Sequence, residues 1–192
     1  MMNSQSNEQP CVSVSKSNWQ TLERFVEIRS SWLTLIGEKL QDEQKQILDY
    51  WRVEKADSVV IITMQNDRFL LPKPSYRPGL GRTTLDFPGG RVLPEQTAVN
   101  AVPNILKREL GIEESEITSI HPLNQTGWAI NSSFSNQTLY GVVAETVSEA
   151  TVNPEKLTPN IYPTTAIGID NLLRDLTCLQ CRAVLLEWRQ NI

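Results

Sequence analysis

The stretch Asp86-Phe87-Pro88-Gly89-Gly90 and the later run Arg108-Glu109-Leu110-Gly111-Ile112 bound the segment that decides the fold of this chain. Residues 83–87 predict a short strand that leads into the Gly89-Gly90 turn. Residues 97–110 predict a helix, because Gly111 stands where a left-handed residue commonly ends one. Pro103 removes one hydrogen bond from that helix, so we expect a kink or a restart there.

On these residues the chain resembles the Nudix pyrophosphohydrolases, which cleave nucleoside diphosphates linked to another group. The family's box reads Gly, five residues, Glu, seven residues, then Arg-Glu-apolar-any-Glu-Glu-any-Gly-apolar. With Gly90 as its first glycine, Gly111 and Ile112 occupy the closing glycine and apolar positions. The inner positions hold Gln96, Asn104, Ile105, Leu106, Lys107, Arg108 and Glu109, so one of the four glutamates remains.

In an intact box the last glutamates share one helix face and, with a carbonyl of the glycine turn, hold Mg²⁺. The resemblance therefore implies Glu109 as a catalytic residue and, together with the carbonyl of Gly90, as a ligand of Mg²⁺ or Mn²⁺. Here Ile105 offers no ligand atom, and Arg108 places a positive charge where the cation would bind.

Two interpretations of the box stay open. In the first, Glu109 and Gly90 keep a reduced metal site that other carboxylates complete, with Glu145, Glu149 and Glu155 as candidates for the general base by position. In the second, the box only folds the loop and helix, and no metal is needed. If Arg108 points into the former metal site, it could pair with a phosphate itself; the alternative is that it faces solvent.

The flanking sequence resembles the ADP-ribose and nucleoside-diphosphate-sugar pyrophosphatase branch, through Tyr76-Arg77-Pro78, Gly79-Leu80-Gly81 and the stretch 85–90. This implies that Arg77 contacts a diphosphate, for which a guanidinium is chemically suited. Arg82 and Arg91 flank the same turn and could do likewise or stay solvated. In that branch an N-terminal hairpin exchanges contacts with a second subunit, and its aromatic residues can stack on adenine. Trp32 and Trp51 could play that part or pack in a core or dimer contact.

Outside the box, residues 31–40 and 47–54 predict a hairpin, and residues 58–64 and 138–147 predict strands of a central sheet. Residues 18–29 show a weak pattern, interpreted as a short helix or irregular segment, and residues 167–189 predict one helix. These elements and the resemblance together imply an α/β (α+β) Nudix-type α/β/α sandwich with a mixed sheet and an N-terminal β-hairpin extension. The expected division is a disordered lead-in at 1–17, a hairpin extension at 18–56 that could contact a second subunit, and a Nudix domain at 57–192.

A net charge of −4 gives no reason to expect nucleic acid or an anionic membrane as a partner. No apolar run approaches the roughly 20 residues that cross a bilayer. Three cysteines without framework spacing (Cys11, Cys178 and Cys181) suit a reducing compartment, and we expect a cytoplasmic protein. Cys178 and Cys181 form a C-x-x-C, which we interpret as part of, or beside, the buried stripe of the C-terminal helix rather than a redox or zinc motif.

The sequence thus predicts a hydrolase of ADP-ribose or nucleotide-sugar compounds, weakened by the loss of most box glutamates and using Mg²⁺, Mn²⁺ or no metal. The alternative is a catalytically inactive Nudix-fold protein that binds or senses a nucleotide. A purely structural protein is a third possibility, which the retained Arg77 disfavours. In either leading case we expect a small-molecule nucleotide diphosphate as ligand and a homodimer.

Overall fold

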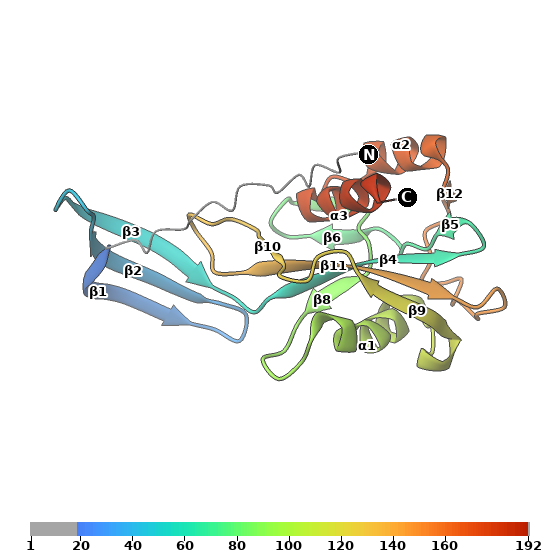
Figure 1. Cartoon of the computed structure of the whole chain (residues 1–192), viewed down its shortest axis with the longest axis horizontal. Helices are drawn as coiled ribbons and strands as arrows, with labels where there is room; N and C mark the ends of the chain where they lie inside the picture. The colour runs from blue at the N-terminus through green and yellow to red at the C-terminus, as the bar shows by residue number, and fades with distance from the viewer. Residues whose placement is uncertain (1–18, 192) are drawn as a thin grey trace, which may run out of the picture.

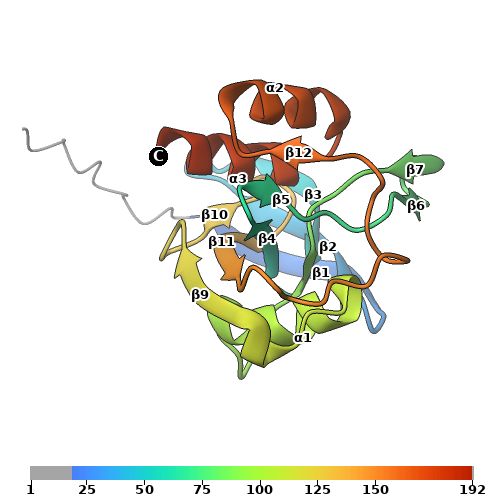
Figure 2. The same cartoon turned by 90° about the vertical axis from the view of Figure 1, so that its right-hand side faces the viewer.

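The computed structural model describes residues 19–191, which form three layers: a central mixed sheet with helices on both faces (Figures 1 and 2). A smaller three-stranded sheet extends from one end of the molecule. The architecture confirms the α/β/α sandwich expected from the sequence. None of the helices in residues 19–191 is long and apolar enough to cross a membrane. The predicted lead-in at 1–17, including Cys11, lies outside the described residues.

The central sheet is organised around β4 (Ser58–Gln65) and β11 (Thr138–Thr146), which pair in parallel. The remaining strands pair antiparallel to them or to each other: β5 (Arg68–Phe69) and β8 (Gly89–Arg91) beside β4, β9 (Ile117–Pro122) and β10 (Trp128–Ala129) beside β11, and β12 (Tyr162–Pro163) beside β5. The predicted strands at 58–64 and 138–147 are confirmed.

Two apolar cores cover the two faces of this sheet. Val60 and Ile62 of β4 pack toward the C-terminal helices, whereas Val59 and Ile61 pack toward the helix that follows the glycine turn. All four side chains are at most 6% exposed. The β-branched run is apolar at consecutive positions because alternate residues pack into the cores on opposite faces of the sheet.

The helix after the glycine turn, α1 (Ala98–Leu110), has the ends that the sequence predicts. The hydroxyl of Thr97 accepts a hydrogen bond from the backbone N–H of Asn100 at 3.1 Å, and Gly111 ends the helix in the left-handed region with φ of 78°. The helix runs through Pro103 without a break. A single 3₁₀ turn, Glu114–Glu116, then leads into β9.

The single C-terminal helix predicted for residues 167–189 is wrong, because the segment forms two helices, α2 (Ala166–Asp175) and α3 (Leu179–Gln190). Between them Leu176 is extended and makes an isolated bridge with Leu85. The guanidinium of Arg182 donates to the carbonyls of Leu173 and Leu176 at the end of α2. Leu176 is buried, so the spacing of apolar residues continues through the segment between the two helices. The hydrophobic periodicity therefore does not reveal the break.

The N-terminal extension is a three-stranded antiparallel sheet of β1 (Gln20–Arg29), β2 (Thr34–Gln41) and β3 (Ile47–Glu54). The predicted hairpin is confirmed as β2 and β3, but the helical or irregular interpretation of residues 18–29 is wrong. Register shifts at 21–23 and 24–26 interrupt the alternation in β1, which explains its weak sequence pattern. The extension joins the main body through a hydrogen bond of 2.8 Å from Val53 N–H to the carbonyl of Phe134.

The proline-rich segment before the glycine turn folds as a short hairpin of β6 (Ser75–Arg77) and β7 (Arg82–Thr84), which projects from the body in Figure 2. Thr84 lies at the base of this hairpin and Arg77 lies beside its turn, and the side chains of both bind Asp86.

Candidate functional site

The predicted glycine turn, Gly89-Gly90, is part of strand β8, and a side chain at either position would be crowded. A Cβ atom on Gly89 would lie 2.8 Å from the carbonyl oxygen of Val59, and one on Gly90 would lie 3.1 Å from Cδ1 of Ile105. The turn is therefore pressed between β4 and α1. This close approach brings the backbone of Gly89 to the end of the helix that carries Arg108 and Glu109.

Arg108 and Glu109 bind opposite polar groups of Gly89. The Glu109 carboxylate accepts a hydrogen bond from Gly89 N–H at 3.2 Å, while Nη2 of Arg108 donates to the Gly89 carbonyl at 2.8 Å. The same nitrogen lies 2.6 Å from Oε1 of Glu109. Arg108 thus points into the box, where a carbonyl and a carboxylate already converge. The sequence expectation named the carbonyl of Gly90; the carbonyl beside Glu109 is that of Gly89.

The residues present do not fit Mg²⁺. Mg²⁺ requires near-octahedral oxygen coordination, usually with one or two carboxylates. Around the Gly89 carbonyl the structure offers one carboxylate, Glu109, and that carboxylate is paired with a guanidinium. Ile105 presents only carbon atoms to the turn. A divalent ion at this place would meet the charge of Arg108 at close range.

Arg77 borders the same pocket as Gly89 and Glu109 and is held by Asp86. Its Nε and Nη2 atoms are 2.8 and 2.7 Å from Oδ2 of Asp86, which also accepts a hydrogen bond of 2.9 Å from the Thr84 hydroxyl. The Asp86 residue is 8% exposed, whereas the Arg77 side chain is 50% exposed. Asp86 therefore orients the guanidinium and leaves its remaining N–H groups directed to solvent.

Gly89, Glu109 and Arg77 line one pocket of about 330 Å³, called the Gly89 pocket. Its walls come from the start of β4, from the glycine turn, from the end of α1 and from the start of α3, and its polar and charged side chains are those of Ser58, Arg77, Asp86, Arg91, Glu109, Cys178, Gln180 and Cys181. The structure thus brings together Arg77, Arg91, Arg108 and Glu109 of the predicted site residues. Arg108 reaches the pocket through its contacts with Gly89 and Glu109.

The other predicted substrate contacts lie outside this pocket. Trp32 is 66% exposed in the turn before β2, and Arg91 lies over its ring, with Cζ 4.3 Å from the ring centroid. Trp51 on β3 packs edge-to-face on Phe25 at 5.5 Å. Arg82 is exposed on β7 and is not among the residues around the pocket.

The candidate general bases also lie elsewhere. Glu145 accepts a hydrogen bond from Ser119 and lines a different hollow with Gln65 and Trp188. Glu149 and Glu155 are likewise absent from the walls of the Gly89 pocket. No carboxylate from the later loops of the described chain therefore completes the box.

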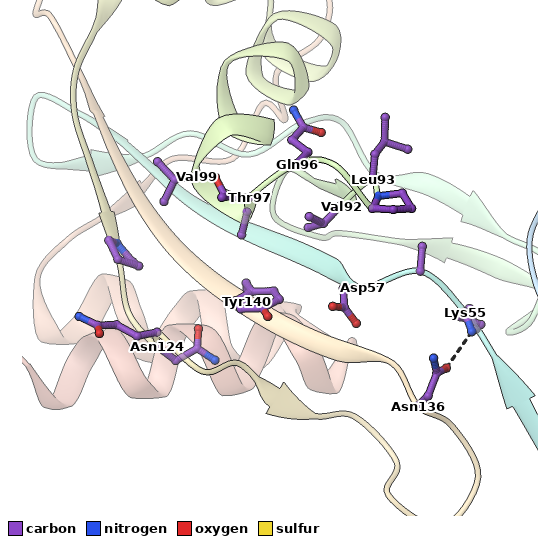
Figure 3. A pocket seen from close by; sticks show the side chains of 15 residues that line it. Lys55, Asp57, Val92, Leu93, Gln96, Thr97, Val99, Asn124, Asn136 and Tyr140 are labelled. Carbon is purple, nitrogen blue, oxygen red and sulfur yellow. Dashed lines mark hydrogen bonds between the residues drawn. The ribbon is translucent and has the colours of Figure 1, made fainter.

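A larger cavity, of about 610 Å³, lies at the start of α1 and is shown in Figure 3. Its walls include Gln96, which holds the first glutamate position of the box, together with Asp57, Asn124 and Tyr140. It shares no wall residue with the Gly89 pocket and contains no arginine. A diphosphate therefore finds more cationic donors at the Gly89 pocket.

The C-x-x-C pair is the feature of the pocket that sequence reasoning missed. Cys181 is buried in the core, as predicted, Cys178 is the N-cap residue just before α3, and both border the pocket. The pKa of the Cys178 thiol is lowered to about 6, first by its hydrogen bond with Cys181 and further by the backbone N–H groups of Cys181 and Gln180. The same thiol pair raises the pKa of Cys181, and burial adds to that shift. The spacing of the cysteines was visible, but the helix break that places Cys178 at a helix start was not.

The whole chain is similar in shape to a solved structure of an ADP compounds hydrolase. The two match with a TM-score of 0.68 and 21% sequence identity, over 97% of this chain and 96% of that one. The fold is Nudix-like. No protein-family model and no curated protein sequence matches the chain. At this identity the similarity establishes the Nudix-like fold, and the activity has to be argued from the pocket.

Proposed function

We propose that this protein binds a nucleoside diphosphate derivative in the Gly89 pocket of its Nudix-like fold, with arginine side chains taking the place of Mg²⁺. The observation that carries the proposal is the position of Arg108. Its guanidinium binds the Gly89 carbonyl and Glu109, which are the groups that a Nudix box uses to hold metal. A covalently attached cation there offers N–H donors to phosphate oxygens without a bound ion.

The charge of the pocket supports an anionic ligand. Arg77, Arg91 and Arg108 supply three positive charges, and Asp86 and Glu109 supply two negative ones, so the groups sum to +1. Each carboxylate is already bound to an arginine. The exposed guanidinium N–H groups thus remain for a ligand, and a diphosphate presents several oxygens that can accept hydrogen bonds from them.

The ligand class rests on two further points. The similar solved structure is an ADP compounds hydrolase, which directs attention to ADP-containing compounds such as ADP-ribose. Trp32, stacked under Arg91, offers an exposed indole near the pocket, and indole faces suit purine rings. ADP-ribose and nucleotide sugars are therefore the first compounds to test.

Hydrolysis of such a compound is the second candidate function. It is favoured by the fold and by Glu109, the one box glutamate that remains, which lies at the pocket wall. Two observations stand against it: the donor set does not fit Mg²⁺, and Glu145, Glu149 and Glu155 are not among the residues that line the pocket. Product release from ADP-ribose with Mg²⁺ or Mn²⁺, lost in Glu109→Gln, would favour hydrolysis over binding alone.

The test of the main proposal is isothermal titration with ADP-ribose and a panel of nucleotide sugars in EDTA. We expect binding by the wild type, retention in Arg108→Lys, and a loss of tenfold or more in Arg108→Glu. Arg174→Glu is the matched control, because Arg174 is an exposed arginine on α2 that lies away from the pocket. Binding in EDTA that Arg108→Glu leaves unchanged would overturn the proposal.

A further inference from the structure

One group of side chains on the pocket wall offers metal-ligand atoms that the proposed diphosphate contact does not use. Asp86, Cys178 and Cys181 each offer one ligand atom, and these atoms all lie within 4.8 Å of one another. They come from separate parts of the chain: Asp86 follows β7, whereas Cys178 is the N-cap residue of α3 and Cys181 lies in its first turn. The isolated bridge between Leu85 and Leu176 brings these two segments together.

The two oxygens of Asp86 have different surroundings. Oδ2 accepts hydrogen bonds from Arg77 and from Thr84. Oδ1 faces the thiols, and its partner among the hydrogen bonds of the described residues is Sγ of Cys181 at 3.8 Å. Asp86 is buried, so Oδ1 is a nearly dehydrated carboxylate oxygen with one weak thiol donor. An oxygen so placed is short of a partner.

We propose that Asp86, Cys178 and Cys181 form a binding site for a thiophilic divalent cation of the Zn²⁺ type, with its fourth position open to the pocket. Thiolate ligands select Zn²⁺ over Mg²⁺, and two cysteines separated by two residues are a common arrangement for tetrahedral zinc. Arg77 and Thr84 hold the carboxylate through Oδ2, as hydrogen-bonding neighbours hold the ligands of protein metal sites.

Charge and proton balance agree with this assignment. Binding breaks two S–H bonds, releases both protons to solvent and forms two metal–sulfur bonds and one metal–oxygen bond, with no oxidation. The three anionic ligands and one divalent cation carry a net charge of −1, which the adjacent Arg77 guanidinium offsets.

A disulfide between the same cysteines would use both sulfur atoms but would remove the thiol proton that faces Asp86. Oδ1 would then be buried without a donor, which is unfavourable. A cation instead satisfies both thiolates and Oδ1 together. The arrangement of Asp86 therefore favours metal over disulfide.

The first experiment uses the full chain, reduced with a phosphine and free of nucleotide, titrated with Co²⁺ and then Zn²⁺. We expect one equivalent of Co²⁺ to give thiolate-to-cobalt charge-transfer absorption, which Zn²⁺ displaces. Cys178→Ser should abolish the band, and Cys11→Ser, at the cysteine outside the described residues, is the matched control that should keep it. No band in a wild type whose thiols are shown to be free, or an equal band in Cys178→Ser, would overturn the proposal.

A second variant tests the role of Asp86 without deleting a ligand. Thr84→Val removes the hydroxyl that holds Oδ2, and the loss of such an outer contact weakens metal binding by about 10- to 100-fold. An unchanged metal affinity in folded Thr84→Val would contradict the arrangement around Asp86. Because neither experiment contains nucleotide, the result stands or fails independently of the proposed diphosphate binding.

Discussion

Nη2 of Arg108 lies 2.6 Å from Oε1 of Glu109, although the two residues are consecutive in α1. Side chains at i and i+1 of a helix normally diverge. Here both turn toward the peptide groups of Gly89, which receives one hydrogen bond from Arg108 and donates one to Glu109. The contact shows that the end of α1 is arranged around the glycine turn even though the usual glutamates are missing.

A single substitution should restore part of a metal site. Arg108→Glu places a second carboxylate beside Glu109 and the Gly89 carbonyl and removes the competing charge, so Mg²⁺ gains oxygen ligands. We expect Mg²⁺ to raise the Tm of Arg108→Glu and to leave the wild-type Tm unchanged, because a ligand stabilises only the state that binds it. The double variant with Glu109→Gln is the control and should lose the effect. An equal Mg²⁺ response in the wild type would show that Arg108 does not occupy the cation position.

Gly89→Ala should destabilise the protein by about 1–3 kcal/mol, since its Cβ would lie 2.8 Å from the Val59 carbonyl and force the turn away from β4. Urea unfolding measures the change. Gly79→Ala is the matched control, because a Cβ there meets nothing within 4 Å, and we expect its effect to stay within about 0.5 kcal/mol. Equal effects at the two glycines would contradict the steric account.

Glu38 should make stability depend on pH. It is 3% exposed and lies between Arg52 and Arg24, at 2.9 and 3.0 Å, and these contacts lower its pKa, that with Arg52 most. A depressed carboxyl pKa stabilises the fold above the unfolded-state value, and the contribution disappears as the pH falls through the folded-state value. We expect Glu38→Gln to cost about 2 kcal/mol at pH 7.

Urea unfolding of wild type and Glu38→Gln at a series of pH values tests this. The difference should shrink steadily below the ordinary glutamate pKa. Glu23→Gln is the control in the same sheet, because Glu23 pairs with Lys39 at 3.3 Å with both side chains well exposed, and it should cost less than about 1 kcal/mol. A difference for Glu38→Gln that stays constant to low pH would be the contrary result.

We expect the N-terminal sheet to form a homodimer contact. Exposed large apolar side chains lie on β1 and β3, just before β1 and in the turn before β2, namely Trp19, Leu22, Phe25, Ile28, Trp32, Ile47 and Trp51. An apolar surface of this kind marks an interaction site. Trp51→Glu should therefore convert dimer to monomer in light scattering coupled to gel filtration. Ile167→Glu, at an exposed isoleucine on α2, should leave the mass unchanged; a monomeric wild type would refute the expectation.

The sequence predicted the central fold because its signals there are local. Thr97 and Gly111 end α1 through their own hydrogen bonds and backbone angles. The continuous β-branched run of β4 indicates a strand that is buried on both faces. The sequence did not predict the break between α2 and α3. At that break Leu176 is extended and bridges Leu85, and the spacing of apolar residues carries no information about this long-range contact.

The candidate site was predictable in part for the same reason. Spacing identified Glu109 and Arg108, but the direction of Arg108 depends on the Gly89 carbonyl, which is set by tertiary packing. The approach of Asp86 to the cysteines likewise requires the break before α3. Residue type identifies these side chains as candidates, but the tertiary structure determines which of them lie close together.

The guanidinium of Arg108 is covalently attached, so a chelator cannot remove it. The cation position beside Gly89 and Glu109 is therefore filled at every Mg²⁺ concentration. Where a diphosphate compound carries Mg²⁺, its phosphate oxygens cannot bind the ion and the guanidinium equally well. Such a pocket would take the metal-free fraction of its ligand. Its apparent affinity would therefore fall as free Mg²⁺ rises, the reverse of the dependence expected of a metal-assisted hydrolase.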